Sequence, residues 1–329
     1  MPDGTDHKFG GPWTEVKLDA ISEYLSFYNA ALQHKPWPHQ PFKRWYVDAF
    51  AGSGERVESR TVGGLFDGGP ERTEIVTRKG SARRALAVTP PFHHLIFIEN
   101  DPGRFNSLCG IKSESPTRDI ICVQGDANAE LLRIFTSTPW SHQTGGRGGH
   151  RAVVFLDPYG MEVQWATLKA LADTGAVDVW YLFPLHAAVR QLARDYSAVD
   201  ESKRRSLNEV FGTEDWQSEL YSFDAGMDLF NQPIDRKTRT ATPRQIEAYA
   251  KARLETVFVY VSDPLPLLLE RGAQLFSLFC ATGNHSRAAH DLIRKGVKHV
   301  LTKFGPASRR TSGHVVLSQT PSCSDRPIV

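Results

Sequence analysis

In residues 44–55 an apolar run is followed directly by a glycine turn, and this pattern constrains the fold of the 329-residue chain. Its first half is rich in aromatic and β-branched side chains, which is typical of a buried strand. Gly52 and Gly54 follow, and glycine allows positive φ and lets a ligand approach where a Cβ would intrude. The stretch predicts a strand that enters a nucleotide-sized turn, with an ordinary tight strand-to-helix turn as the alternative.

Three further apolar runs, residues 94–102, 120–128 and 152–160, also end at acidic residues, which are Glu99, Asp126 and Asp157. Their hydrophobicity is continuous rather than alternating, as in parallel strands that helices cover on both faces. Ligands of open α/β sheets bind beyond the carboxyl ends of the strands. Together with Asp48 at the end of the first strand, these carboxylates are therefore expected to converge on one crevice.

The successive motifs resemble those of class I S-adenosylmethionine (SAM) dependent methyltransferases. The resemblance lies in residues 48–54, in Glu99, in residues 125–127 and in residues 157–159. The combination of Phe-Ala-Gly-Ser-Gly with Asp-Pro-Tyr is similar to the enzymes that methylate amino groups of nucleic acids, whose signature is Asp-Pro-Pro-Tyr or Asn-Pro-Pro-Tyr. This chain has one proline where that signature has two.

A more extensive resemblance is to the bacterial three-Cys-motif partner protein family (TcmP), and it covers residues 13 to 300. The matching segments are residues 13–17, 48–52, 97–99, 155–161, 180–184 and 279–285. The resemblance implies a Rossmann-like α/β fold with a mostly parallel sheet and an antiparallel last strand. It also implies SAM as the cofactor and a three-Cys-motif, radical-SAM-like protein as a partner.

The chemistry of SAM gives the strand-end residues their expected roles. Gly52 and Gly54 suit the methionine portion, Glu99 the ribose hydroxyls, and Asp126 the adenine edge, while Asp48 is expected near the amino-acid end of the cofactor. The full set of cofactor-binding residues that we expect is Asp48, Phe50, Ala51, Gly52, Gly54, Glu99, Asn100, Asp126 and Ala127.

The motif at residues 157–159 is the expected catalytic element. Asp157 is placed to hydrogen-bond an incoming amine, the carbonyl of Pro158 to share that role, and Tyr159 to stack on a planar base. Transfer from a sulfonium depends mainly on positioning, because an aligned near-attack geometry itself supplies several powers of ten in rate. The alternative for this motif is a turn that ends a strand.

Three functions remain open from the sequence. The first is SAM-dependent methylation of an exocyclic amine, in RNA or DNA. The second is a SAM- or nucleotide-binding partner module without transfer activity of its own. The third is a nicotinamide-dependent oxidoreductase, because Glu99 resembles a ribose-binding acid, but Gly52-Ser53-Gly54 has no third glycine at the required spacing.

Composition narrows the class of protein. A net charge of +2 gives no global signal for a polyanionic partner, so nucleic-acid binding would need a local patch. No membrane span and no signal peptide are apparent, which predicts a cytoplasmic protein without membrane contacts. The four cysteines, Cys109, Cys122, Cys280 and Cys323, show no paired spacing, so free thiols rather than a metal site are expected.

The chain divides into five predicted parts. These are a helical lead-in (1–40), a first part of the core (41–186), a helical insertion (187–255), a second part of the core with a hairpin and a helix (256–304), and a disordered tail (305–329).

Two local predictions concern the surroundings of the crevice. The insertion after Gly54, up to residue 80, is expected to be a lid or a substrate loop, because it begins at the cofactor turn and contains several arginines; a solvated loop of mixed charge is the alternative. The amphipathic helix over residues 13–32 is expected to pack on the sheet, and Lys17 and Trp13 are not favoured to face the crevice.

Overall fold

The computed structural model describes residues 12–37, 39–64, 69–137, 139–140, 149–223, 236–269 and 272–305, with the backbone alone for Pro12, Trp37, Gln40, 57–64 and 69–76. The N-terminal residues 1–11, the tail after Gly305 and Cys323 lie outside the described residues, so the predictions made for them stay predictions.

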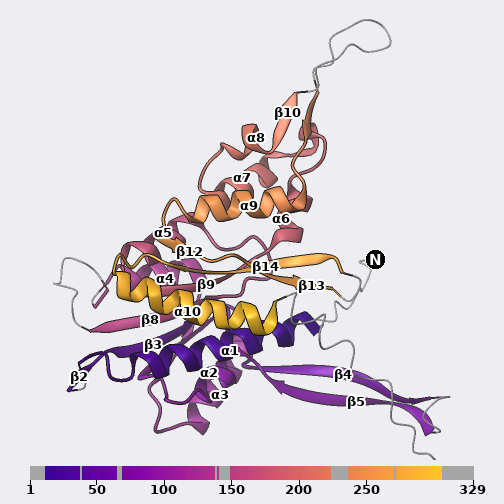
Figure 1. Cartoon of the computed structure of the whole chain (residues 1–329). Helices are drawn as coiled ribbons and strands as arrows, with labels where there is room; N and C mark the ends of the chain where they lie inside the picture. Colours follow the sequence, from indigo (N-terminus) through magenta and orange to yellow (C-terminus); the bar gives the residue numbers. More distant parts are fainter. Residues whose placement is uncertain are drawn as a thin grey trace, which may run out of the picture.

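A mostly parallel sheet forms the centre of the protein (Figure 1). Its order is β12-β14-β9-β8-β3-β6-β7, and β13 also pairs with β14. The parallel strands are β3 (Lys43–Asp48), β6 (His94–Glu99), β7 (Ile120–Gln124), β8 (His150–Leu156) and β9 (Val177–Phe183). The antiparallel strands are β12 (Tyr260–Val261), β13 (Leu265–Leu268) and β14 (Gln274–Thr282). The predicted Rossmann-like sheet with an antiparallel last strand is confirmed.

Helices cover both faces of this sheet because successive strand residues point to opposite sides. Tyr46 and Phe97 pack on one face, whereas Val47 and Ile98 pack on the other. The first face is covered by α1 (Pro12–Leu32), α2 (Ser81–Leu86), α3 (Pro102–Glu114) and α10 (Arg287–Phe304). The second is covered by α4 (Ala127–Phe135) and α5 (Trp165–Asp173).

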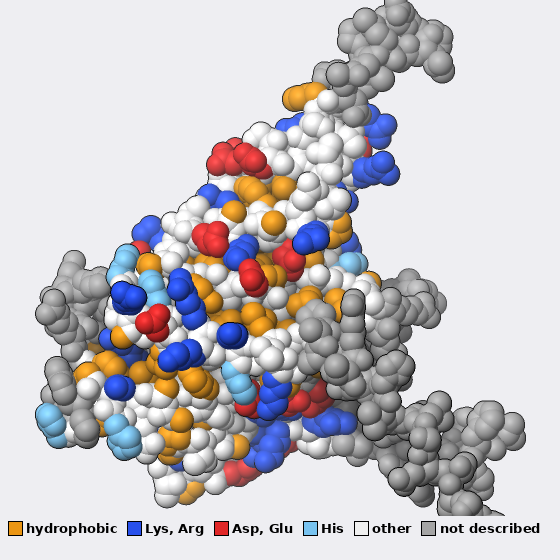
Figure 2. All heavy atoms as spheres, viewed as in Figure 1, with side chains coloured by type: hydrophobic (Ala, Val, Ile, Leu, Met, Phe, Trp, Pro, Cys, Tyr) orange, Lys and Arg blue, Asp and Glu red, His pale blue; other side chains and the backbone are white. Residues whose placement is uncertain are grey.

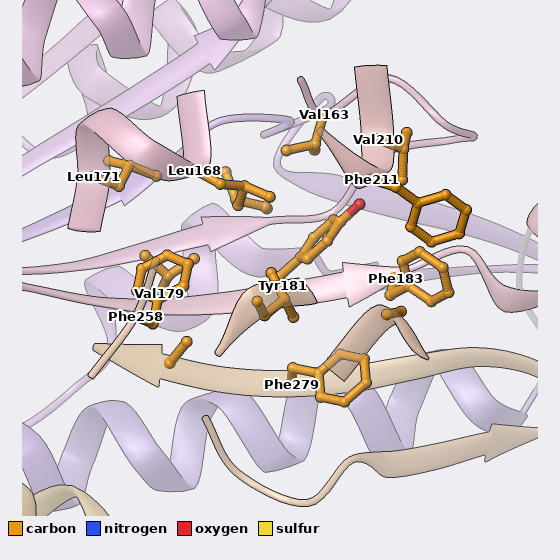
Figure 3. Close-up of a cluster of buried hydrophobic side chains, with 14 of the residues drawn as sticks. Val163, Leu168, Leu171, Val179, Tyr181, Phe183, Val210, Phe211, Phe258 and Phe279 are labelled. Carbon is orange, nitrogen blue, oxygen red and sulfur yellow. The ribbon is translucent and has the colours of Figure 1, made fainter. Parts of the chain in front are cut away.

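The region predicted as a helical insertion is mostly helical and shares the core of the sheet. Its elements are α6 (Leu185–Gln191), the 3-10 helix η2 (Tyr196–Ala198), α7 (Glu201–Phe211), α8 (Trp216–Glu219), β10 (Tyr221–Phe223), β11 (Lys237–Arg239) and α9 (Pro243–Leu254). Phe211 of α7 packs 6.2 Å from the ring of Phe183 at the end of β9, beside Tyr181 (Figure 3). The short hairpin β10–β11 was not predicted.

The insertion after the glycine turn is a β-hairpin rather than the loop that the sequence suggested. Its strands β4 (Glu55–Gly64) and β5 (Gly69–Lys79) pair antiparallel and extend away from the sheet (Figure 1). The signal was present, because the β-branched residues Thr73, Ile75, Val76 and Thr77 are concentrated in this short stretch. A second, smaller hairpin joins β1 (Pro36–Trp37) to β2 (Gln40–Pro41).

Two further elements complete the sheet and its cover. Helix α3 extends to Glu114, and Ile111 as well as Leu108 is buried against the sheet. The proline-bearing connection before β14 contains the edge strand β13, and Pro266 is tolerated there because an edge strand need not donate every backbone hydrogen bond.

The three described cysteines are free. Cys280 is buried in β14, while Cys109 and Cys122 are half-buried. Burial raises the pKa of the Cys122 thiol to about 11, so it is protonated at neutral pH.

Candidate functional site

Two adjoining cavities lie at the carboxyl ends of the parallel strands. We call the first, of about 530 Å³, the α1 cavity, and the second, of about 590 Å³, the Glu99 cavity. The α1 cavity is lined by residues that include Trp13, Lys17, Ala51, Gly52, Gly54, Asp157, Pro158 and Phe276. The Glu99 cavity is lined by residues that include Glu99, Asn100, Asp126, Ala127 and Glu162. Phe50, Arg104 and Tyr159 line both cavities. Three of the four strand-end carboxylates expected to converge, those of Glu99, Asp126 and Asp157, therefore border these adjoining cavities, and Asp48 borders neither.

The glycine turn is tied directly to the end of the neighbouring strand. Gly52 has φ +61° and Gly54 has φ +73°. The backbone N–H of Gly52 donates to Oε2 of Glu99 at 2.9 Å, and the backbone N–H of Asp101 donates to Oε1 at 2.9 Å. Glu99 is only 6% exposed, so its carboxylate fixes the turn and still borders the Glu99 cavity.

Two helices begin at the Glu99 cavity. Asp126 caps α4 by accepting from the backbone N–H of Ala129 at 3.0 Å, and Asp101 caps α3 by accepting from that of Arg104 at 2.8 Å. N-terminal helix dipoles favour negative or acceptor groups of a ligand. Burial raises the pKa of Glu162, which also lines this cavity. The capping contact is a structural reason for Asp126 at this position. Its predicted contact with adenine stays a proposal.

Lys17 and Trp13 line the α1 cavity, and the expectation that they would not face the crevice was wrong. The Lys17 ammonium lies 2.7 and 2.5 Å from the two carboxylate oxygens of Asp157. The Trp13 ring packs 4.9 Å from that of Phe276, at the start of β14. Because β14 is antiparallel, its first residues lie at the same edge of the sheet as the last residues of the parallel strands. Phe276 therefore lines the cavity, although the sequence did not predict it as a site residue.

Ion pairs hold the first turns of α1 above the glycine turn. Glu15 of α1 pairs with Arg56, at the base of the β4–β5 hairpin, and at 2.6 Å with Arg84 of α2. Arg84 also pairs with Asp19.

The arginines near the base of the hairpin are thus engaged within the chain. Arg83, like Arg56 and Arg84, binds carboxylates, at 2.7 Å from Glu55 and 2.8 Å from Glu114. These contacts favour the interpretation of mixed charge over a phosphate-binding surface here. The side chains of Arg60 and Arg72 lie outside the described part of the chain.

Tyr159 stands at the boundary of the two cavities and is 53% exposed. The guanidinium of Arg104 lies 5.1 Å from the centre of its ring and also donates to its hydroxyl. Arg104 in turn lies 3.7 Å from Glu99. An exposed aromatic face beside a cation is available to a planar ligand.

Asp48 lies beneath the site and is absent from the described residues that line either cavity. It is fully buried, where it accepts from the hydroxyl of Tyr46 at 3.2 Å and from the backbone N–H of Phe50 at 3.4 Å. Burial raises the pKa of its carboxyl to about 7. Its position supports the strand end rather than direct contact with a ligand.

Among the described residues, no group of three or more His, Cys, Asp or Glu side chains has the arrangement of a metal site. None of the helices in the described ranges is both long enough and apolar enough to cross a membrane.

Comparison with known proteins gives likeness in fold. No model of a known protein family and no curated sequence matches the chain. Protein LPL1258 of Legionella pneumophila, from family DUF519, is 11% identical with a TM-score of 0.45, and the match covers 90% of this chain and 93% of that one. A SAM-dependent methyltransferase from Clostridium acetobutylicum is 10% identical with a TM-score of 0.34, covering 81% and 92%. The N-terminal domain of EvdMO1, solved with SAH bound, is 11% identical with a TM-score of 0.36, covering 79% of each chain. Membership of the three-Cys-motif partner family stays a prediction from the sequence motifs.

Proposed function

We propose that this protein binds SAM across the two cavities and transfers its methyl group to an amine held in the α1 cavity. The observation that carries the proposal is the glycine turn, which Glu99 fixes at the junction of the two cavities through Gly52. A nucleoside that carries a charged side arm needs two such adjoining compartments, one for the sugar and base and one for the arm.

The Glu99 cavity suits the adenosine part of the cofactor. The Glu99 carboxylate has oxygens that accept hydrogen bonds from ribose hydroxyls, and Asp126 and Asn100 line the same cavity with polar groups for the adenine edge. Phe50 and Ala127 supply apolar surface beside them. The methionine arm then passes over Gly52 and Gly54 into the α1 cavity, where the absence of a Cβ on Gly52 leaves open space.

The acceptor that we propose is an exocyclic amine of a nucleic-acid base, in RNA or DNA. Tyr159 offers a half-exposed ring face, and Trp13 and Phe276 form a second aromatic wall of the cavity. Bases stack on such rings irrespective of sequence. Asp157 and the carbonyl of Pro158 would hold the amine hydrogens, so that the nitrogen lone pair points at the methyl group. Bound SAM would supply that methyl group as its carbon–sulfur bond breaks, and the methylated nitrogen would release one proton to solvent.

The position of Lys17 favours a second candidate function. Both oxygens of Asp157 already accept hydrogen bonds from Lys17, so an acceptor amine must share the carboxylate or displace the lysine. A chain that binds SAM but leaves this pair intact would act as a binding module, for example beside the three-Cys-motif, radical-SAM-like protein that the sequence resemblance implies.

Calorimetry with SAM, SAH and NAD tests the cofactor first. We expect SAM and SAH to bind, and Glu99→Ala to weaken SAM about ten- to a hundred-fold, because charge-assisted hydrogen bonds contribute about 1.5–3 kcal/mol. The matched control is Glu209→Ala, an exposed acid on α7. Preferential binding of NAD, or unchanged SAM affinity in a folded Glu99→Ala protein, would remove the assignment.

Methyl transfer is tested with labelled SAM and separate pools of bacterial RNA and DNA. The unmodified protein is expected to label one pool, and Asp157→Asn to abolish labelling while SAM affinity changes less than about twofold. Tight SAM binding without label in either pool favours the binding-module candidate. Full labelling by Asp157→Asn would defeat the proposed role of this carboxylate.

A further inference from the structure

Helix α10 presents a row of exposed basic side chains to solvent. Arg287, Arg294, Lys295 and Lys298 are all exposed, and their separations of seven, eight and eleven residues correspond to two or three helical turns. They therefore lie along one face of the helix. Figure 2 shows Lys and Arg side chains gathered over α10 on the face in view. We call these four residues the α10 basic stripe.

The stripe differs from the other basic side chains near it in having no ion-pair partner. Within the described part of the chain, no carboxylate forms an ion pair with any of its four residues, although Asp291 is exposed on the same helix. By contrast, His299 and Lys303 of α10 both bind Glu23 of α1, at 2.7 and 2.8 Å. The net charge of the whole chain is only +2, so an excess of cations does not explain this gathering.

Packing holds the stripe in a fixed position relative to the α1 cavity. Ile293 and Val297, on the opposite side of α10, are buried against the sheet. At Gly296 the helix approaches α1 so closely that a Cβ would lie 2.6 Å from the ring of Phe27. Figure 1 shows α10 alongside α1. The two helices meet at Phe27 and Glu23 of α1, and the earlier turns of α1, with Trp13 and Lys17, line the α1 cavity.

We propose that the α10 basic stripe binds the sugar-phosphate backbone of the nucleic acid whose base enters the α1 cavity. This inference rests on the proposed function and adds the surface that holds the substrate. From Arg287 to Lys298 the helix rises about 16 Å, which is the axial length of about five phosphates of one duplex strand. Cations without a carboxylate partner along a rigid helix complement a run of phosphates in charge and in overall length. The recognition would not depend on base sequence.

Salt-dependent binding tests the stripe directly. Fluorescence anisotropy is measured with a labelled RNA of about 20 nucleotides and with a DNA duplex of similar length, between about 50 and 200 mM salt. Arg294→Gln/Lys295→Gln/Lys298→Gln is expected to weaken binding at least about tenfold. It should also reduce the salt slope by about two to three, because each lost phosphate contact removes about 0.7–0.9.

A matched variant removes the same charge elsewhere. Lys203→Gln/Arg204→Gln/Arg205→Gln lies on α7, within the helical region, and is expected to change binding less than about twofold. SAM affinity, measured by calorimetry, should be retained in both variants, which shows that each is folded with its cofactor site intact.

The outcomes separate this inference from the proposed function. If the two variants weaken nucleic-acid binding equally, the effect comes from net charge alone, and the proposed role of the stripe is overturned. The protein could bind SAM but neither nucleic acid, or bind phosphatidylserine vesicles more tightly than the RNA. Either result would overturn the proposed role of the stripe and leave a methyltransferase with another substrate. If SAM does not bind, the proposed function fails and the inference falls with it.

Discussion

The ammonium of Lys17 contacts both carboxylate oxygens of Asp157, at 2.7 and 2.5 Å, and so joins helix α1 to the end of strand β8 across the α1 cavity. The two residues are 140 positions apart in the sequence. The Lys17 side chain is 5% exposed and that of Asp157 is 21% exposed. Removing one partner therefore leaves the other charged group unpaired and poorly solvated.

A double-mutant cycle is expected to show strong coupling between these residues. Lys17→Met should lower the free energy of unfolding by about 3 kcal/mol, because it leaves a charged carboxylate poorly solvated. Asp157→Asn should also destabilise the protein, whereas the double variant Lys17→Met/Asp157→Asn should regain most of the loss. Urea denaturation of the four proteins measures the cycle. If the two single effects simply add, the ion pair is not what holds α1 over the cavity.

The two glycines of the turn are expected to respond differently to alanine. Alanine at either position costs about 1–2 kcal/mol, because its Cβ disfavours the left-handed backbone that glycine adopts freely. A Cβ on Gly52 meets no atom within 4 Å, but one on Gly54 would lie 2.3 Å from Cδ1 of the buried Ile111.

Gly52→Ala should thus lose SAM affinity with a small loss of stability, because its methyl group enters the cofactor space. Gly54→Ala should lose about 1–3 kcal/mol more stability, owing to overpacking against α3. Thermal unfolding and calorimetry with SAM on both variants test this. A larger stability loss at Gly52 than at Gly54 would contradict the packing argument.

The sheet and the strand-end residues were predictable because their signals are local. Continuous apolar runs that end in Asp or Glu specify parallel strands and place their termini at one edge, and this brought Glu99, Asp126 and Asp157 to the same pair of cavities. The amphipathic pattern of α1 likewise gave its extent, Pro12–Leu32, within a residue.

Residues that reach the site through tertiary packing were not predictable in this way. Lys17 faces the cavity because Glu15 and Asp19 bind Arg56 and Arg84, contacts that span 41 to 69 positions in the sequence. Helical periodicity shows which residues share a face but not what that face packs against. Asp48 was misplaced for the converse reason, because a strand-end carboxylate can turn inward and bond to its own strand.

Asp48 is expected to make stability depend on pH below neutrality. Burial raises the pKa of its carboxyl from 3.8 to about 7, so the native state keeps a proton that the unfolded state loses above about pH 4. The free energy of unfolding should therefore fall as pH rises from about 4 to 7, by about 4 kcal/mol from this group, and then level off.

Asp48→Asn isolates this effect because the amide cannot ionise. The difference in unfolding free energy between the two proteins, measured by denaturant titration across this pH range, should follow the stated fall. Asp178 is buried with a pKa raised to about 6 by desolvation, but both proteins share it, so it cancels in the difference. A difference that stays constant with pH would show that Asp48 ionises normally in the folded protein.

Tyr159 is expected to act through its ring face rather than through its hydroxyl. Tyr159→Ala should raise the KM for the nucleic-acid pool that becomes labelled by about five- to a hundred-fold, because stacking of a base on an aromatic ring contributes about 1–3 kcal/mol. Tyr159→Phe keeps the ring and the cation–π contact with Arg104, and should retain most activity, although it loses the hydrogen bond to that arginine. SAM affinity is measured in both variants as the control, because Tyr159 lines both cavities and its loss must not damage the cofactor site. Equal losses in Tyr159→Phe and Tyr159→Ala would assign the role to the hydroxyl and its bond to Arg104, and would refute stacking as the contribution of this residue.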